Sequence, residues 1–191
     1  MSSSEHGASS SGFLATWTRR PGDETWWAPL VVVHALAVWF LVGLIWTVHH
    51  VHYPLFALVG PTEYSEFQAD HVDRIGAVLA VPWLVEGIAT LGLLVVARRR
   101  RDVVAVLVGA AAAGGVLLIS GLASAPAHAE LADGFDVAAH DRLMTWNLVR
   151  ASLWTLKGAT AALLLCWLVA DRRSATTAGP AADAAAAGGV R

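Results

Sequence analysis

Histidines near the ends of apolar runs are the residues of this chain best suited to chemistry. They are His49, His50, His52, His71, His128 and His140. A neutral imidazole is the commonest metal ligand and a general acid or base near neutral pH. The local cluster in WTVHHVHYPLF cannot present three ligands on one helical face, so a site requires histidines from several segments.

The apolar runs predict the elements that position these side chains. Of 191 residues, 56% are hydrophobic and 15% are charged, whereas soluble domains have about 25% charged residues. Four runs reach the length of about 20 residues that crosses a membrane. They span residues 29–48, 75–97, 103–127 and about 143–170. We therefore predict an all-α membrane protein built as a bundle of four transmembrane helices.

The two ends of the chain differ in composition from this bundle. The N-terminus is rich in Ser and Gly, and the C-terminus is mostly Ala, Gly, Thr and Pro. Such sequences bury too little apolar surface to offset the entropy of ordering. We predict disordered tails at 1–25 and 174–191 and a transmembrane domain at 26–173. The single cysteine, Cys166, gives no disulfide framework.

Arginines predict how the bundle is oriented. Arg19 and Arg20 precede the first run, residues 98–101 join the second and third runs, and Arg172 and Arg173 follow the fourth. Short loops rich in Arg and Lys stay on the cytoplasmic side. We therefore expect a protein of the bacterial cytoplasmic membrane with both termini on the cytoplasmic side and the two acidic connections on the outer side.

With this topology, histidines from all four helices reach one level at the outer surface. A rise of about 1.5 Å per residue gives this level to His52, His71, His128 and His140. A single interfacial histidine is more often a tolerated polar-tipped residue than a ligand, but four at one level favour a metal site. Histidine and carboxylate ligands without thiolate suit iron, copper or zinc, and the sequence does not choose among them.

Ionisable residues inside the membrane are expensive and suggest function. Glu86 falls near the middle of the second run, and the fourth run carries a polar stripe on one helical face. The stripe comprises His140, Asn147, Arg150, Trp154 and Lys157. Lys157 lies within about one helical turn of the depth of Glu86, which predicts an ion pair with either a structural or a proton-transfer role. Trp83 and Trp154 are candidates to line a cofactor pocket.

The third run is rich in Gly, Ala and Ser, which predicts a central and closely packed helix. Pro126 is expected to end this helix and present His128. His34 lies near the cytoplasmic side and cannot join the outer group.

Short motifs also suggest a relationship to known proteins. They are HYPLF, FQADH, PWLVE, PAHAELADGFD and HDRLMTWNLVRASLW, and they lie between about residues 29 and 170. Together they resemble bacterial four-helix membrane proteins of the anthrone-oxygenase-like group. The resemblance implies an oxygenase or related oxidoreductase acting on aromatic, polyketide-like or lipid-soluble substrates, and it implies no settled cofactor. By position it singles out His52, His71, Glu86, His128, Asn147, Arg150 and Trp154.

The leading interpretation is an integral membrane oxidoreductase with a histidine-lined metal site at the extracytoplasmic side. Arg150 and Asn147 would orient an anionic or carbonyl-bearing substrate, with Glu86 as base or proton relay. A second interpretation is a haem b or quinone-binding electron-transfer protein. Its haem ligands would come from His34, His49, His52 and His128.

A third interpretation is non-enzymatic: an accessory subunit of a membrane complex, or a small transporter. The expected partners are membrane lipid and a small hydrophobic substrate. A formal net charge of −2 gives no reason to expect nucleic acid. Assembly into a homo-oligomer or a larger membrane complex is left open.

Overall fold

The computed structural model describes the backbone of residues 23–188 and the side chains of residues 25–174. Its regular structure is helical throughout this part of the chain. The first half contains α1 (Asp23–Thr47), the π-helical segment η1 (Val48–His52), the 3-10 segment η2 (Tyr53–Leu58) and α2 (Tyr64–Val96). The second half contains α3 (Arg100–Ile119), the π-helical segment η3 (Ser120–Ser124), α4 (Ala125–Ala132) and α5 (Val137–Gly188).

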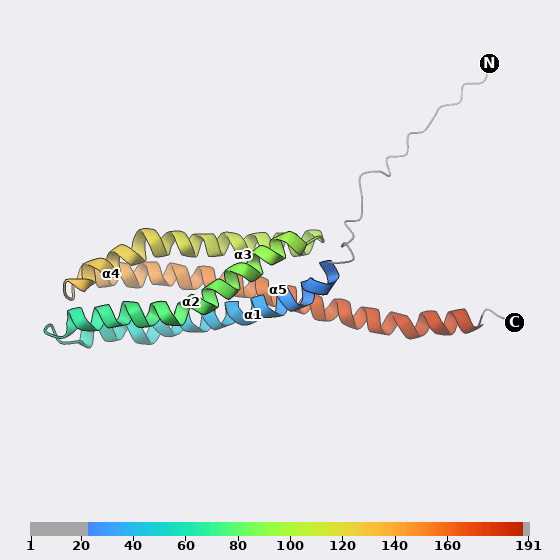
Figure 1. Ribbon diagram of the computed structural model, residues 1–191, viewed down its shortest axis with the longest axis horizontal. Helices are drawn as coiled ribbons and strands as arrows, with labels where there is room; N and C mark the ends of the chain where they lie inside the picture. Colours follow the sequence, from blue (N-terminus) through green and yellow to red (C-terminus); the bar gives the residue numbers. More distant parts are fainter. Residues whose placement is uncertain (1–22, 189–191) are drawn as a thin grey trace, which may run out of the picture.

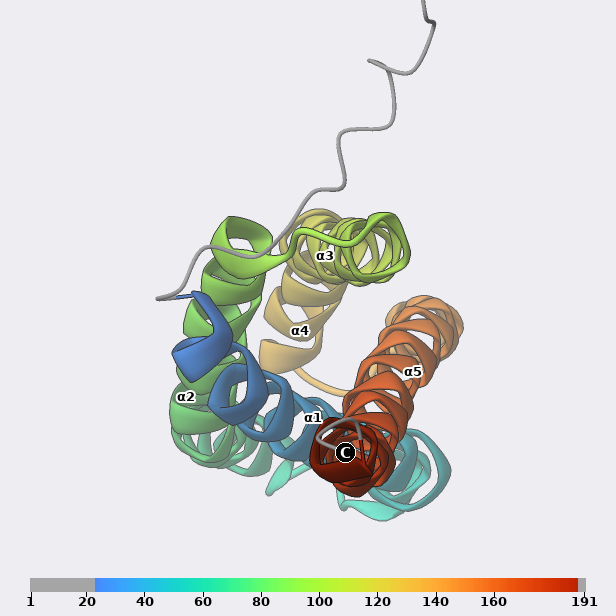
Figure 2. The same cartoon turned by 90° about the vertical axis from the view of Figure 1, so that its right-hand side faces the viewer.

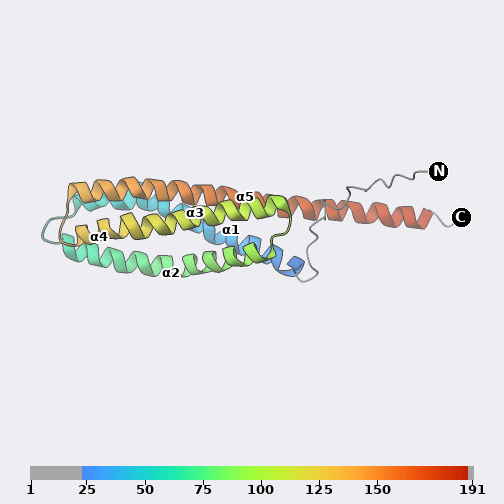
Figure 3. The ribbon, with the colours of Figure 1, turned by 90° about the horizontal axis from the view of Figure 1, so that it is seen from above.

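The helices lie side by side along one axis, and α5 continues past the others at one end (Figures 1 and 3). Seen from that end, α1, α2, α5 and the continuous α3, η3 and α4 surround a common interior (Figure 2). α1 packs on both α2 and α5, while α3 packs mainly on α5. The start of α1 and the end of α5 lie at the same end of the bundle (Figure 1).

Four helical stretches in the described residues are long and apolar enough to cross a membrane. Large aliphatic side chains such as Leu36, Val81, Leu91 and Leu122 stand exposed on the outer faces of the bundle. In a membrane these side chains face lipid tails, so their exposure carries no penalty. The predicted all-helical fold with four candidate membrane helices is confirmed.

The helices are longer than the apolar runs that predict them. α2 begins at Tyr64 and not near Ile75, so Glu66, Asp70 and Asp73 lie on helical turns and not in a loop. Hydropathy detects only the part of a helix matched to the hydrocarbon layer, whereas backbone hydrogen bonding continues into polar turns beyond it.

The core divides into three clusters along the bundle axis. One lies at the end with the α1–α2 and α4–α5 connections and includes Phe56, Tyr64 and Leu143. A middle cluster includes Val38 and Trp154, and a third, at the opposite end, includes Trp27, Leu93 and Leu164.

The Gly-rich third helix packs closely on α5, as predicted. A Cβ at Gly109 would lie 2.8 Å from Thr160 Oγ1, and one at Gly115 would lie 3.0 Å from Leu153. The helix is not the most buried of the four, however. Of its most apolar 18 residues 28% are buried, against 44% in the first span, 39% in the fourth and 22% in the second.

One further expectation differs from the structure. Pro126 does not end the third helix, because the chain passes through η3 and starts α4 with Pro126 in its first turn, where a missing N–H is tolerated. The disordered C-terminal tail at 174–191 stays a prediction, and the α5 backbone is helical to Gly188. The predicted N-terminal tail lies outside the described residues except for 23–25.

Candidate functional site

Two π-helical segments shape the end of the bundle that carries the histidines. η1 interrupts the first span at Val48–His52 and η3 interrupts the third at Ser120–Ser124. A π-turn adds a residue to the helix, rotates the side chains that follow it and is frequent at functional sites. Val48 from η1 and Ser124 from η3 line the same cavity, so both irregularities face one place.

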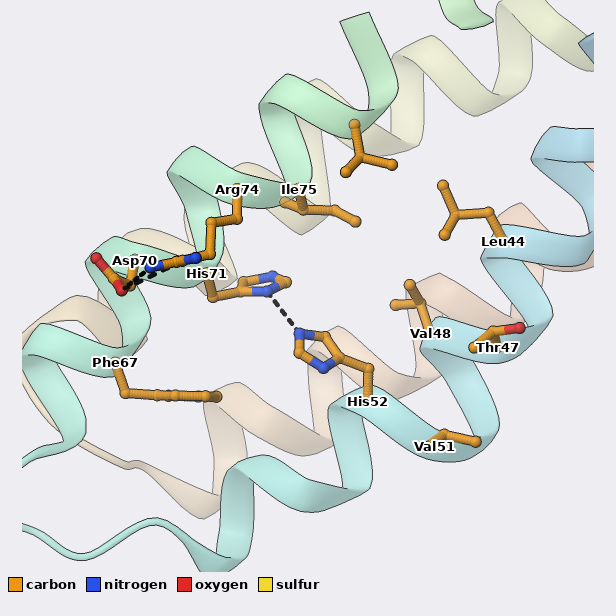
Figure 4. A pocket seen from close by; sticks show the side chains of 11 residues that line it. Leu44, Thr47, Val48, Val51, His52, Phe67, Asp70, His71, Arg74 and Ile75 are labelled. Atoms are coloured by element: carbon orange, nitrogen blue, oxygen red, sulfur yellow. Dashed lines mark hydrogen bonds and ion pairs between the residues drawn. The ribbon is translucent and has the colours of Figure 1, made fainter.

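Three of the four histidines predicted as metal ligands meet at this level. His52 Nε2 lies 2.7 Å from His71 Nδ1, and these two side chains point at one another (Figure 4). The rings of His71 and His128 are 5.2 Å apart between centroids. The fully buried ring of Phe56 packs on all three, with centroid distances of 5.4, 4.9 and 6.4 Å to His52, His71 and His128.

His128 is hydrogen-bonded through both ring nitrogens. Its Nε2 lies 3.1 Å from the Tyr53 hydroxyl, and its Nδ1 lies 2.8 Å from Gln68 Nε2. Because the amide nitrogen donates, this arrangement makes Nδ1 an acceptor and orients the ring. Nε2 then carries the ring proton and donates it to the hydroxyl oxygen of Tyr53.

His140 does not join the three. Its Nε2 donates to the backbone carbonyl of Tyr53 at 2.9 Å, while its ring lies 6.3 Å from Phe56. His50 stacks on Trp46 at 5.3 Å, and His49 accepts from Asn147 Nδ2 at 3.4 Å. The sequence cluster therefore divides, and only His52 belongs to the interior group.

The imidazoles do not fit a common metal ion in this arrangement. A tetrahedral ion with bonds of 2.0–2.1 Å holds two nitrogens about 3.3 Å apart, and an iron between two trans imidazoles holds them about 4 Å apart. His52 Nε2 and His71 Nδ1 lie 2.7 Å apart, which is the distance of a hydrogen bond between the two rings and too short for a shared metal ion. Within the described residues, no group of three or more His, Cys, Asp or Glu side chains is placed to hold a metal. The metal and haem assignments stay predictions.

A cavity of about 360 Å³, here called the inner cavity, extends from His128 toward the middle of the bundle. All four spans contribute to its wall, which is mostly aliphatic and aromatic, and Trp83 and Trp154 lie at its deeper end. The polar side chains that line it are Tyr53, Ser120, Ser124, His128 and Arg150. Its size and its few convergent polar groups are typical of a small-molecule site.

Arg150 is the charged group of the inner cavity. It is 8% exposed, and its Nη1 donates to Ser124 Oγ at 3.1 Å, while its Nε has no partner among the described residues. No carboxylate among the described residues forms an ion pair with Arg150. A buried cation of this kind is costly unless an anion or strong acceptor joins it.

Other buried polar atoms without partners gather in the same third of the bundle. Besides Arg150 Nε they are Tyr64 Oη, Gln68 Oε1, His71 Nε2 and Asn147 Oδ1. Native interiors leave few such atoms, and each points to a water, an ion or a ligand. Their concentration here singles out this end of the molecule.

Glu86 and Lys157 form a separate centre deeper in the bundle. Lys157 is fully buried, and its Nζ contacts Glu86 Oε1 at 2.6 Å, Thr90 Oγ1 at 3.1 Å and the Gly109 carbonyl at 3.3 Å. These contacts use all three donors of the ammonium. Thr90 also donates to Glu86 at 2.6 Å. The predicted ion pair is confirmed, and Lys157 does not reach the surface.

A smaller cavity of about 120 Å³ adjoins Glu86. Trp83 and Trp154 line both this space and the inner cavity, so the two indoles separate the Arg150 centre from the Glu86 centre. His34, expected to stand alone, lies 3.9 Å from Glu86 Oε1 and 3.4 Å from Thr90 Oγ1, so it belongs to the deeper centre.

Several site residues were missed in the sequence although periodicity offers a signal for some. Gln68 precedes His71 by three positions, and Ser124 precedes His128 by four, so each shares a helical face with a histidine. Tyr53 and Phe56 give no such signal, because their orientation depends on η1 and η2.

Comparison with known proteins gives no relative for this arrangement: no family model, no curated protein and no solved structure matches the chain.

Proposed function

We propose that this protein is an integral membrane oxidoreductase of oxygenase type whose inner cavity binds a lipid-soluble substrate with an anionic or carbonyl oxygen. One observation carries the proposal: the buried guanidinium of Arg150 faces a mostly apolar cavity and has no carboxylate partner among residues 25–174. A ligand oxygen on that group would replace the missing partner. The reaction class comes from the motif resemblance alone.

Arg150 and Tyr53 would bind the substrate oxygen. Both line the inner cavity, and both can donate a hydrogen bond to one acceptor. In a site from which water is excluded, donors aimed at a developing negative charge stabilise it strongly. Hydrogen bonds to charged groups contribute about 1.5–3 kcal/mol each.

Tyr53 would move the proton, with His128 Nε2–H donating to its oxygen. The Tyr53 oxygen takes the proton of a substrate C–H next to the carbonyl as its own hydroxyl proton passes to the carbonyl oxygen, and the resulting enol oxygen rests on Arg150. Dioxygen then oxidises the activated carbon, so that a methylene becomes a carbonyl and one water leaves. Positioned acid–base groups contribute about 10²- to 10⁴-fold to such steps.

Oxygen uptake tests this proposal. Purified protein in nanodiscs is supplied with 1,8-dihydroxyanthrone or a similar hydroxyaryl ketone, and uptake is compared with the protein-free rate. We expect acceleration that falls by about 10- to 100-fold in Arg150→Gln, the loss of one charged hydrogen bond.

The matched control for this experiment is Arg142→Gln. Arg142 is an exposed arginine of the same helix, paired with Glu130, and its replacement should leave the rate unchanged. A rate no faster than the protein-free reaction across a panel of such ketones contradicts the proposal, as does equal activity in Arg150→Gln.

A further inference from the structure

A second cavity of about 440 Å³ lies between α1 and α2, and we call it the outer groove. Leu44, Val48 and Val51 form its α1 and η1 side, and Phe67, Ile75 and Val78 form its α2 side. Figure 4 shows His52 and His71 between these walls. Val51 and Val78 are 55% and 47% exposed, so the outer groove opens sideways to the surroundings of the bundle.

The outer groove is continuous with the wall of the inner cavity. Leu44, Val48 and Ile75 line both spaces. A molecule that fills the outer groove therefore touches the same side chains as one that occupies the inner cavity. One ligand can extend from one space to the other past these residues.

The polarity of the outer groove is that of a lipid-tail site. Of its lining residues, Asp70 and Arg74 are charged, and they pair with each other at 3.0 Å while remaining well exposed. The remainder is aliphatic and aromatic apart from Thr47 and the two imidazoles. Along α2 the groove runs from Phe67 to Val78, about 16 Å at the helical rise, and its end at Ile75 and Val78 lies within the second apolar run.

A different opening, between α2 and α4, also reaches the inner cavity. Its lining includes Ala69, Ala125, Ala129 and Asp73 and no lysine or arginine. A carboxylate without a cation at this mouth repels an anionic head group. The outer groove, where Arg74 neutralises Asp70 at the rim, is the better match to a ligand that binds Arg150.

We propose that the outer groove holds the hydrocarbon tail of the substrate whose polar head lies on Arg150. The substrate class is then a single-chain amphiphile, with a carbonyl-bearing or anionic aromatic head and an alkyl or isoprenoid tail, that enters from the lipid phase between α1 and α2. This inference rests on the proposed function for the head group and adds the tail, the entrance and the substrate class.

Photolabelling tests the inference. The probe is a hydroxyaryl ketone with a dodecyl chain that ends in a diazirine, added to the full-length protein in phosphatidylcholine nanodiscs. We expect labelled peptides that contain residues 44–51 and 67–78. Excess unlabelled dodecyl compound should compete, and the ethyl analogue, which has the head group alone, should compete only at a higher concentration.

A groove-filling variant makes the test specific. Val78→Trp should lower labelling of these peptides at least about tenfold, because overpacking excludes the chain. Ile88→Trp is the matched control, since Ile88 is also an exposed α2 residue but lies outside the outer groove. Both variants are compared in the same lipid, so the partition of the probe into the bilayer affects their labelling equally.

Three outcomes overturn the inference: label at Ala125 and Ala129, label spread evenly over the lipid-facing surface, or label in the groove from a diazirine phospholipid that the dodecyl compound does not displace. Failure of the proposed function has a different signature. If Arg150→Gln leaves groove labelling unchanged, the groove still binds the tail and only the head-group assignment is wrong.

Discussion

Tyr53 and His128 both line the inner cavity, and the proposed acid–base step depends on the hydrogen bond between them. The Tyr53 hydroxyl lies 3.1 Å from His128 Nε2, and Tyr53 is 4% exposed. Tyr53→Phe should keep the packing and lower turnover by about 100-fold, the lower range for a positioned acid–base group. Substrate binding should fall much less, which a comparison of kcat with KM will measure.

Tyr64→Phe is the matched control for this prediction. Tyr64 is also fully buried at this end of the bundle, but its hydroxyl has no hydrogen-bond partner among the described residues. Its removal should leave both activity and stability nearly unchanged. Equal loss in the two variants would mean that Tyr53 acts only through packing.

The irregular element η3 fixes the register of the residues that follow it. Insertion of one alanine after Leu122, an exposed residue inside η3, adds a residue beyond the one that the π-turn already absorbs and should rotate His128 by about 100° away from Tyr53 and Gln68. We expect ligand binding in the inner cavity to be lost. Leu122→Ala keeps the length and should retain binding, as tryptophan fluorescence will report; binding in the insertion variant would contradict this role for η3.

The pairing of α2 with α5 through Glu86 and Lys157 is a structural coupling that can be measured. Removing one partner of a buried ion pair costs about 3–5 kcal/mol because the other charge is left uncompensated. We expect Lys157→Met and Glu86→Gln each to lower the unfolding temperature in detergent, and the double variant to lose much less than the sum. Additive losses would show that the two side chains are not coupled.

At this scale, hydropathy predicts the spans because a membrane demands long apolar helices, and helical periodicity predicts the stripe of Asn147, Arg150, Trp154 and Lys157. The stripe is buried as expected. Neither signal predicts the π-turns, because these depend on tertiary packing. The directions in which His52 and His128 point therefore could not be predicted from the sequence. His140 shows the consequence, since its predicted depth is compatible with the cluster but its ring bonds to a backbone carbonyl.

For the whole molecule, the arginine-rich end is expected on the cytoplasmic side. In a Cys166→Ser background, Asp133→Cys in the α4–α5 connection should react with a membrane-impermeant thiol reagent on intact cells. Arg100→Cys in the α2–α3 connection should react only after permeabilisation, because positively charged loops remain inside. The reverse pattern would place the histidine cluster at the cytoplasmic face.

The molecule as a whole separates two polar centres along its axis, and only one of them adjoins a large cavity. Sequence position places Glu86 and Arg150 at different depths, but it does not reveal that Trp83 and Trp154 lie between them. That partition depends on how side chains from α2 and α5 meet. It supports the proposed binding of substrate at Arg150, because Lys157 already has three protein partners.

The most direct test of the account is the affinity of the inner cavity for an oxygen-bearing ligand that cannot be oxidised further. Quenching of tryptophan fluorescence by 1,8-dihydroxyanthraquinone gives this affinity in nanodiscs. The account predicts saturable binding that weakens at least about tenfold in Arg150→Gln, as expected for one charged hydrogen bond, and is unchanged in Arg142→Gln. Equal affinity in wild type and Arg150→Gln would contradict it.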